Sequence, residues 1–276
     1  MKPFDPARIS QAATAADDAE SRRARELADT LEARGQRVKL AAAFRLIARA
    51  GLDAGTAGHI SLRVPGAPDY FWVNPFGLHF SEVTAANLVL VNGRGEIVAG
   101  GPLINYAAFC IHGAIHQARP DINCAVHTHP PAGCAYAALG LPLDPLDQTG
   151  CSFFEDHAVY SEYDGIVIDP AQSRGLVAAL GKKRALILAN HGLLTCAATV
   201  EQALIDMLDL ERTCAVNLRA LATGHPVRAI PAAAARQAKA VLTQPGRWTF
   251  QWRPLIRELS RHETDYDPHG WGGPED

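Results

Sequence analysis

Residues 119–133 read RPDINCAVHTHPPAG, and this stretch anchors the interpretation of the whole chain. Its apolar run INCAV predicts a buried strand that ends before the proline pair Pro130-Pro131. Because side chains alternate along a strand, His127 and His129 leave it on the same side, at its C-terminal end. Two imidazoles at the end of a buried strand are the most informative feature of the sequence.

A third histidine ends another apolar stretch, RALILANHG, at residues 184–192. If this strand lies beside the first, His127, His129 and His191 converge at one rim of a sheet. Three neutral histidines with an open coordination position suit one catalytic divalent ion, Fe²⁺, Zn²⁺ or Mn²⁺. By spacing alone, the first two could equally be a packed or surface pair, and His191 an ordinary turn residue.

The remaining elements follow from apolar periodicity and from turn residues. Helices are predicted at residues 21–52, 105–118, 130–140, 173–181 and 200–223. Strands are predicted after the Gly-rich turn at 55–58, at 70–75, in a hairpin over 88–100, and at 165–170. Helices and strands alternate without a strict βαβ order, which favours a mixed or antiparallel sheet with helices packed on it.

The chain has no internal repeat, and we expect one main domain. Residues 1–27 are polar, which predicts a flexible N-terminal segment. The domain is expected to span residues 28–245, and residues 246–276 are expected to form a C-terminal tail. No apolar run reaches the roughly 18 residues of a membrane span, and no apolar core follows the first charges as in a secretory signal. The six cysteines include no CxxC pair and predict buried thiols in a reducing, cytoplasmic setting.

Charge and motifs exclude several classes of partner. Lys and Arg number 26 against 29 Asp and Glu, a net charge of −3, which gives no footprint for nucleic acid or an anionic membrane. Neither GxGxxG nor GxxxxGK[ST] occurs, so no nucleotide-phosphate fingerprint is present. These observations favour a small-molecule substrate.

Several segments over about residues 36–225 resemble the class II aldolase/adducin family. The resemblance implies a three-layer α/β/α sandwich around a mainly antiparallel central sheet, an α/β fold. It also implies a homotetramer with sites near subunit interfaces, and metal ligation by His127, His129 and His191. The segments that carry it are GTAGHISLRVPG, VNPFGLHFSEVTAANLVLVNGRGEIVAG, HGAIHQARPDINCAVHTHPPAG, EYDGI and LILANHGLLTCAATVEQAL.

One departure from the family concerns proton transfer. Family aldolases carry an acid/base glutamate nineteen residues before the first metal histidine, where this chain has Ala108. Residues 103–117 contain no carboxylate at all. His112, one turn further along the same helix, is our candidate catalytic residue, the alternative being a packed helix histidine.

A second departure concerns phosphate binding. The turns that bind phosphate in the family's sugar-phosphate aldolases correspond here to Ala57-Gly58-His59 and Pro75-Phe76-Gly77. The changes remove hydroxyl and amide donors and add an aromatic ring, which disfavours a sugar phosphate and favours an aromatic, hydroxy- or oxo-acid. The candidate substrate contacts are His59, Asn74, Phe76 and Gly77, although His59 and Asn74 could instead cap turns.

Three functions remain open from the sequence. The first is a metal-dependent lyase, a decarboxylase or aldolase, that cleaves a C–C bond of a hydroxy- or oxo-acid. The second is a non-haem Fe(II) oxygenase that oxidatively decarboxylates an aromatic 2-oxo acid, such as a prenylated 4-hydroxyphenylpyruvate. The third is a non-catalytic, adducin-like interaction module.

Other polar and aromatic residues are interpreted as structural. His116 is expected to be structural or at the surface, and Tyr160 and Tyr163 to reflect packing. The charges of the helix over 200–223 are interpreted as its solvated face: Glu201, Asp206, Asp209, Glu211 and Arg212.

Overall fold

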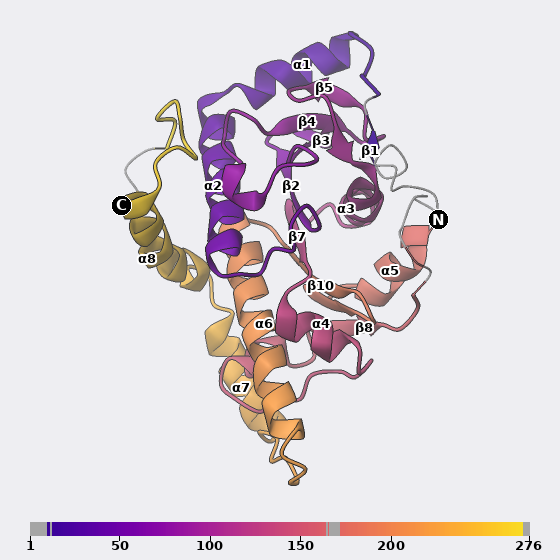
Figure 1. Cartoon of the computed structure of the whole chain (residues 1–276), viewed down its shortest axis with the longest axis vertical. Helices are drawn as coiled ribbons and strands as arrows, with labels where there is room; N and C mark the ends of the chain where they lie inside the picture. Colours follow the sequence, from indigo (N-terminus) through magenta and orange to yellow (C-terminus); the bar gives the residue numbers. More distant parts are fainter. Residues whose placement is uncertain (1–9, 12, 164, 166–171, 273–276) are drawn as a thin grey trace.

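The structure, a computed structural model, describes residues 10–11, 13–163, 165 and 172–272. An eight-stranded sheet forms its centre, with the strand order β5-β4-β3-β2-β7-β10-β9-β8 (Figure 1). Every neighbouring pair is antiparallel except β8 and β9, so the predicted mainly antiparallel sheet is confirmed. The strands are β2 (His59–Val64), β3 (Ala67–Val73), β4 (Val89–Asn92), β5 (Ile97–Ala99), β7 (Cys124–Thr128), β8 (His157–Tyr160), β9 (Ala185–Leu188) and β10 (Gly192–Ala197).

Helices cover both faces of the sheet and confirm the predicted three layers (Figure 1). One face packs against α2 (Leu31–Arg49) and α6 (Val200–Leu221), and α8 (Arg247–His262) lies outside them. The other face packs against α3 (Tyr106–Ala118) and α5 (Ser173–Leu180). The remaining elements are α1 (Ala19–Ala28), α4 (Pro131–Ala137), α7 (Ala232–Leu242), the short 3₁₀ turns η2 (Phe80–Glu82) and η3 (Gly150–Phe153), and the strand pair β1 (Ser10–Gln11) and β6 (Ile104–Asn105).

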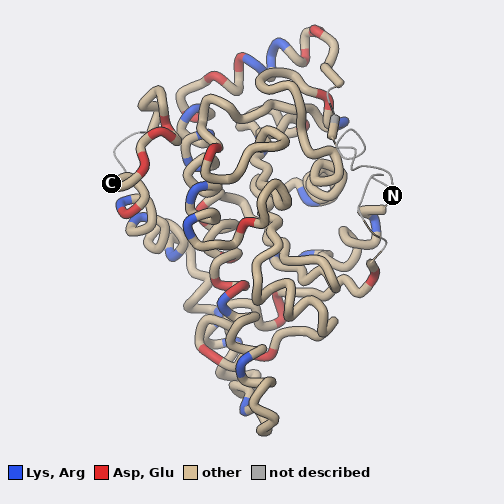
Figure 2. Tube along the Cα trace, in the orientation of Figure 1, with Lys and Arg blue, Asp and Glu red and all other residues tan. Residues whose placement is uncertain are grey.

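Alternation along β7 divides its side chains between the two helical layers. Val126 belongs to the core cluster that includes Phe44 of α2, whereas Ala125 belongs to the cluster that includes Ile115 of α3. His127 therefore shares the α3 side of the sheet with Ala125. Figure 2 shows the formal charges mainly along the outer helices, with few of them on the sheet between.

The N-terminal region differs from its prediction. Within the segment 1–27, expected to be flexible, α1 begins with Asp18 accepting a hydrogen bond from the Ser21 amide at 2.7 Å. Ala24 and Ala28 of α1 are buried in the core. The single helix expected over 21–52 is interrupted at Thr30, whose hydroxyl oxygen accepts from the Ala33 amide and begins α2.

The C-terminal region, which was predicted to be a tail, also contains a packed helix. In residues 246–276, α8 packs against α6 and buries Trp252. The sequence pattern predicted neither the strands β8 and β10 nor the helix α7. The strand predicted at 165–170 lies, apart from Gly165, outside the described residues. The domain boundaries at residues 28 and 245 stay predictions.

The solvated face predicted for α6 is wrong at Asp206, which is fully buried. Its Oδ1 lies 2.5 Å from Nη1 of Arg184 and accepts from the Trp248 indole at 3.2 Å. Trp248 belongs to α8, so α6 is covered by a second helix where the sequence pattern indicated solvent. Glu211 of α6 is also engaged, because its carboxylate accepts from the amides of Ala132 and Gly133 at the start of α4.

Two further predictions concerned membrane-spanning segments and the state of the cysteines. Among the helices of the described residues, none has both the length and the apolarity that crossing a membrane requires. The six cysteines form no disulfide, and all are buried except the half-buried Cys134.

Candidate metal centre and adjoining cavities

His127, His129 and His191 come from two neighbouring elements of the sheet. His127 lies in β7 and His129 directly after it, whereas His191 lies in the turn between β9 and β10. The strand that precedes His191 is β9, and it was expected beside β7. It does not pair with β7, because β10 lies between them. His191 instead reaches the rim of β7 because β10 begins at the next residue and pairs Leu193 with Thr128.

The turn that presents His191 depends on its local sequence. Asn190 has a left-handed φ of 56°, a conformation that asparagine tolerates better than most residues. At Gly192 the two strands approach so closely that a Cβ would lie 2.6 Å from the Thr128 carbonyl oxygen and 2.8 Å from Cδ2 of His129. Only glycine fits this approach without displacing β7 or the ring of His129.

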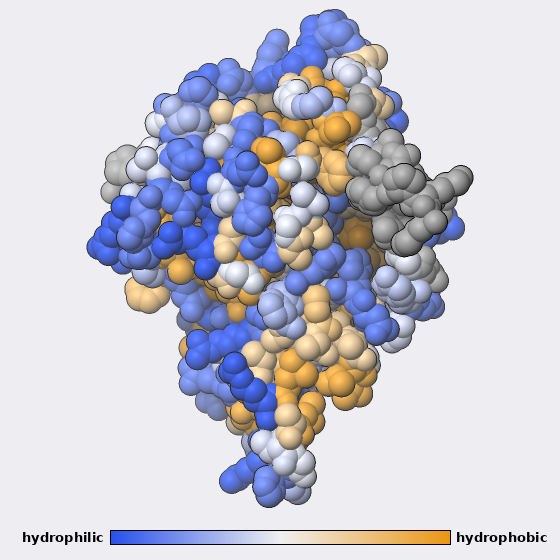
Figure 3. Space-filling model, viewed as in Figure 1, coloured by the Kyte–Doolittle hydropathy of each residue, from blue (hydrophilic) through white to orange (hydrophobic). Residues whose placement is uncertain are grey.

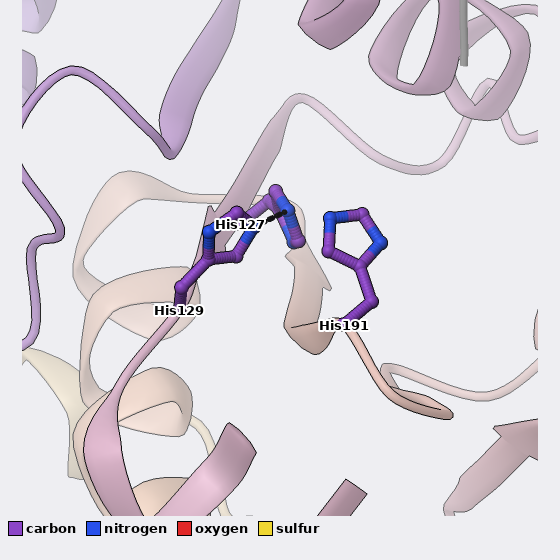
Figure 4. A group of neighbouring side chains, drawn as sticks. All are labelled: His127, His129 and His191. Carbon is purple, nitrogen blue, oxygen red and sulfur yellow. Dashed lines mark hydrogen bonds between the residues drawn. The ribbon is translucent and has the colours of Figure 1, made fainter. Parts of the chain in front are cut away.

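The three imidazole rings face one another (Figure 4). Their centroids are 4.7 to 4.8 Å apart, and one nitrogen of each lies within 4.8 Å of the others. Nδ1 of His127 donates a hydrogen bond to the Leu193 carbonyl oxygen at 2.8 Å, which leaves Nε2 as the ligand atom. Three neutral imidazole nitrogens this close together can serve one divalent ion as ligands.

Burial keeps these imidazoles neutral, the state in which histidine binds a metal. It lowers the pKa of His127 well below 6.5 and also lowers the pKa of His129. Burial, with the neighbouring His129, lowers the pKa of His191 to about 4. In the described part of the chain, this is the one cluster of three or more potential ligands close enough to share an ion. The donor set fits Fe²⁺, Zn²⁺ or Mn²⁺.

A pocket of about 240 Å³ adjoins the three histidines. Among the described residues that line it there is no Lys, Arg, Asp or Glu. Ala108 forms part of its wall, at the position where the family aldolases were expected to carry a glutamate. The other lining residues outside the histidine cluster are Ala57, Gly58, His59, Asn105, Ala107, Ile111, Tyr163 and Gly165.

A second cavity, of about 10 Å³, lies beside the pocket and shares Ala108 and His59 with it. His112 also lines this cavity, with its ring centroid 4.1 Å from that of His59. Nδ1 of His59 and Nε2 of His112 are buried and find no hydrogen-bond partner among the described residues. A buried polar atom left unpaired costs about 1–3 kcal/mol, so these two atoms favour a polar partner in the cavity beside them.

The structure separates the predicted substrate contacts into two groups. His59 lies next to the histidine cluster, 4.9 Å from His127 between ring centroids, and Asn74 lines the second cavity. Phe76 and Gly77 line neither cavity. Their loop is held elsewhere, by a hydrogen bond from the Phe76 amide to the Leu103 carbonyl oxygen at 3.0 Å. The apolar wall of the pocket comes instead from Ala107 and Ile111.

Three residues at or near the site were not identified as functional from the sequence. Tyr163, expected to reflect packing, is 58% exposed and lines the pocket. Ser61 and His116, buried behind His112, form hydrogen bonds with one another at 2.7 Å. The spacing of four between His112 and His116 was the available signal, since it places both on one side of α3.

Comparisons with known proteins identify the family of this chain. The family model described as class II aldolase and adducin N-terminal domain matches residues 38–218. The chain belongs to the class II aldolase and adducin family. Within this family, it is similar to the decarboxylase NovR of Streptomyces niveus, with 40% identity over 198 residues, 71% of this chain and 73% of the relative.

Two further relatives show the range of the family. The 4-hydroxy-3-prenylphenylpyruvate oxygenase/4-hydroxy-3-prenylbenzoate synthase of Streptomyces roseochromogenus subsp. oscitans is 40% identical over 198 residues, 71% of each chain. The solved structure of L-fuculose 1-phosphate aldolase from Glaciozyma antarctica PI12 superimposes with a TM-score of 0.79 at 34% identity, covering 87% of this chain and 95% of the aldolase. Family members named for aldolase, decarboxylase and oxygenase activities therefore share this fold.

Proposed function

We propose that this protein is a divalent-metal-dependent lyase that cleaves a C–C bond of a small hydroxy- or oxo-acid, by decarboxylation or retro-aldol cleavage. The observation that carries the proposal is the cluster of His127, His129 and His191 beside a pocket of about 240 Å³. The metal-binding role of these residues is part of the proposal, and so is the choice among Fe²⁺, Zn²⁺ and Mn²⁺.

The residues of the chain have distinct roles in this proposal. An ion held by the three histidines would supply Lewis-acid polarisation of the substrate's oxygens. The hydrogen bond from His127 to Leu193 orients the first ligand. Ala107, Ala108 and Ile111 form an apolar wall that limits the access of water to the reacting groups.

Proton transfer needs another residue, because Ala108 supplies no carboxylate. His112 is the proposed acid/base, since its buried Nε2 is unpartnered beside the cavity that Ala108 also lines. Decarboxylation is favoured over aldol cleavage, because loss of CO₂ needs less proton transfer. The similarity to a protein named decarboxylase supports this order.

The pocket supports an acid rather than a sugar phosphate. A phosphate needs several strong donors, and the described lining offers neither Lys nor Arg. His59 and Asn74 are the proposed polar contacts of the substrate, with an aromatic ring resting against Ile111 rather than against Phe76.

A second candidate is a non-haem Fe(II) oxygenase acting on an aromatic 2-oxo acid. It is favoured by the 40% identity to the protein named 4-hydroxy-3-prenylphenylpyruvate oxygenase. Three histidines leave coordination positions for both an oxo-acid and O₂. The adducin-like, non-catalytic alternative is disfavoured because all three candidate ligands and the pocket beside them are present.

We also propose a homotetramer in the cytoplasm. Leu139 and Leu141, after α4, are 46% and 47% exposed, and Figure 3 shows apolar surface gathered towards the lower end of the molecule. An apolar surface of this kind is typical of subunit contacts. Analytical ultracentrifugation would test the assembly.

Turnover assays separate the three functions. The metal-loaded protein is incubated with aryl 2-oxo acids and with hydroxy acids, while CO₂ release and O₂ uptake are recorded together. The lyase proposal predicts that CO₂ or aldehyde is released without O₂ uptake. In His191→Ala, this release should be lost. Equimolar O₂ uptake would identify the oxygenase, and a protein that binds metal but turns over none of these acids would contradict both enzymes.

A further inference from the structure

Ser61 connects two buried histidines behind the candidate metal centre. Its Oγ lies 2.7 Å from Nδ1 of His112 and 2.7 Å from Nε2 of His116. All three side chains are at most 2% exposed. Ser61 comes from β2 and the two histidines from successive turns of α3, so the contact joins the sheet to the helix that carries Ala108.

The direction of each hydrogen bond in this series follows from its last member, the Ile122 carbonyl oxygen. Nδ1 of His116 lies 3.3 Å from the Ile122 carbonyl oxygen, which can only accept, so Nδ1 carries the proton. Nε2 of neutral His116 must then accept from the Ser61 hydroxyl. Since Ser61 has one proton to donate, its oxygen accepts from Nδ1–H of His112. Nε2 of neutral His112 is therefore left with its lone pair.

The surroundings keep both rings neutral and fixed. Burial and the Arg63 guanidinium lower the pKa of His116 to about 3, and burial lowers the pKa of His112 well below 6.5. Phe71 stacks on His116 with ring centroids 4.5 Å apart. Arg63 donates to the His116 carbonyl oxygen at 2.9 Å, which ties the same turn of α3 to β2.

We propose that Ser61 and His116 are positioning residues that hold His112 in the tautomer with a basic Nε2 directed at the second cavity. The inference rests on the proposed function in one respect only, that His112 is the acid/base. The second cavity has the size of a single water site, and its other polar lining includes His59 and Asn74. Ala108 and His59 line both cavities, so the proposed path of a proton from the pocket to Nε2 runs past these two residues and through one water.

The proton balance of such a step is simple. In retro-aldol cleavage, Nε2 takes the proton of the substrate hydroxyl, whose electron pair forms the new carbonyl as the C–C bond breaks. The bond's electrons remain on the departing carbon, which receives the proton back from His112. The proton on Nδ1 of His112 stays there and remains hydrogen-bonded to Ser61 throughout. It cannot be relayed through Ser61, because His116 would then have to take up a second proton and it stays neutral.

The tautomer of His112 can be measured directly. In ¹⁵N-histidine solid-state NMR of the Zn²⁺-loaded protein, His112 is assigned by the loss of its signals in His112→Gln. We expect a protonated Nδ1 and an unprotonated Nε2 in the wild type. An unprotonated Nδ1 in the wild type would overturn the proposal, whatever the variants do.

Three variants test the chain of hydrogen bonds. Ser61→Ala removes the acceptor of His112, whereas His116→Phe removes the acceptor of Ser61 and frees its hydroxyl to donate to Nδ1 of His112. Both variants should give a mixture of His112 tautomers and about a tenfold lower kcat at unchanged KM and metal content. His116→Phe keeps a ring on Phe71, whereas His116→Gln restores an acceptor for Ser61 and should rescue the tautomer. A wild-type tautomer in both Ser61→Ala and His116→Phe would contradict the positioning role. If the wild type binds no metal, the proposed function fails, but the same NMR measurement on the metal-free protein still decides this inference.

Discussion

Nε2 of His127 and Nε2 of His129 lie 3.0 Å apart, and the second nitrogen of His127 is already committed to Leu193. Two lone pairs at this distance repel, so either a proton or a cation must lie between them. Without a metal, a proton on Nε2 of His129 would satisfy the pair. A divalent ion would replace that proton, which predicts that His129 changes tautomer when the metal binds.

The close approach at Gly192 predicts a sensitive position outside the ligand set. In Gly192→Ala, the new methyl group would meet the Thr128 carbonyl oxygen and the ring of His129. We expect metal affinity to fall by about 10- to 100-fold, as when other supports of metal ligands are changed. Gly35→Ala in α2, where a Cβ meets no atom within 4 Å, is the matched control and should bind metal like the wild type. Equal affinities in the two variants would show that Gly192 does not position His129.

Restoring a carboxylate in Ala108→Glu should not simply create an aldolase. The surrounding wall is apolar, so the new carboxylate must either reach the metal or be protonated through a raised pKa. If it reaches the metal, we expect tighter metal binding and lower native turnover, measured by competition with a chelator and by kcat. Ala118→Glu, exposed at the end of the same helix, is the control. Unchanged affinity and unchanged turnover in Ala108→Glu would mean that Ala108 is not beside the metal.

Ligand preference follows from the lining of the pocket. A phosphate dianion would lack its usual donors, at about 1.5–3 kcal/mol per charged hydrogen bond, so aromatic 2-oxo or hydroxy acids should bind more tightly than fuculose- or ribulose-type phosphates. Calorimetry on the metal-loaded protein measures both. Ile111→Ala should weaken the aryl acid, whereas Phe76→Ala should not. Micromolar binding of a sugar phosphate, with none of an aryl acid, would overturn both proposed enzyme activities.

Stability should fall in acid because buried histidines must take up protons on unfolding. The pKa of His116 is about 3 in the folded state against 6.5 for an ordinary histidine, so the unfolded chain binds more protons between these values. The stabilisation is complete above pH 6.5 and is lost as the pH falls towards 3. In His116→Gln, the slope of the unfolding free energy against pH should be smaller by about 1.4 kcal/mol per pH unit between pH 4 and 6.

Urea unfolding of the chelator-treated wild type and variant, at a series of pH values, measures that slope. Above pH 7 the two curves should run parallel, because His116 is neutral in both states. Parallel curves down to pH 4 would contradict a buried, neutral His116.

Local pattern was enough for some parts of this molecule and not for others. Alternation along one strand predicted that His127 and His129 share a side, because that relationship is contained in three consecutive residues. The approach of His191 depends on β10, which separates β9 from β7 and is not visible in the spacing. The hydrogen bonds of Ser61 join residues 51 and 55 positions apart, so only the folded chain reveals them.

Two differences between expected and observed positions have a common physical origin in tertiary packing. Asp206 has the spacing of an exposed helix residue, yet Arg184 and α8 cover it. Phe76 follows a strand that borders the site, yet the bond of its amide to Leu103 holds the loop away from both cavities. Contacts with distant segments decided both positions, and periodicity carries no information about them.

Elemental analysis of protein purified without added metal or chelator tests the central claim most directly. The wild type should contain about one Fe, Zn or Mn ion per chain. The variants His127→Ala, His129→Ala and His191→Ala should fall well below that while keeping the fold, judged by circular dichroism. His79→Ala, which alters a histidine that caps η2 outside the cluster, should retain full occupancy. Full occupancy in all three ligand variants, or no divalent metal in a wild type that also fails to bind added ions, would contradict the account.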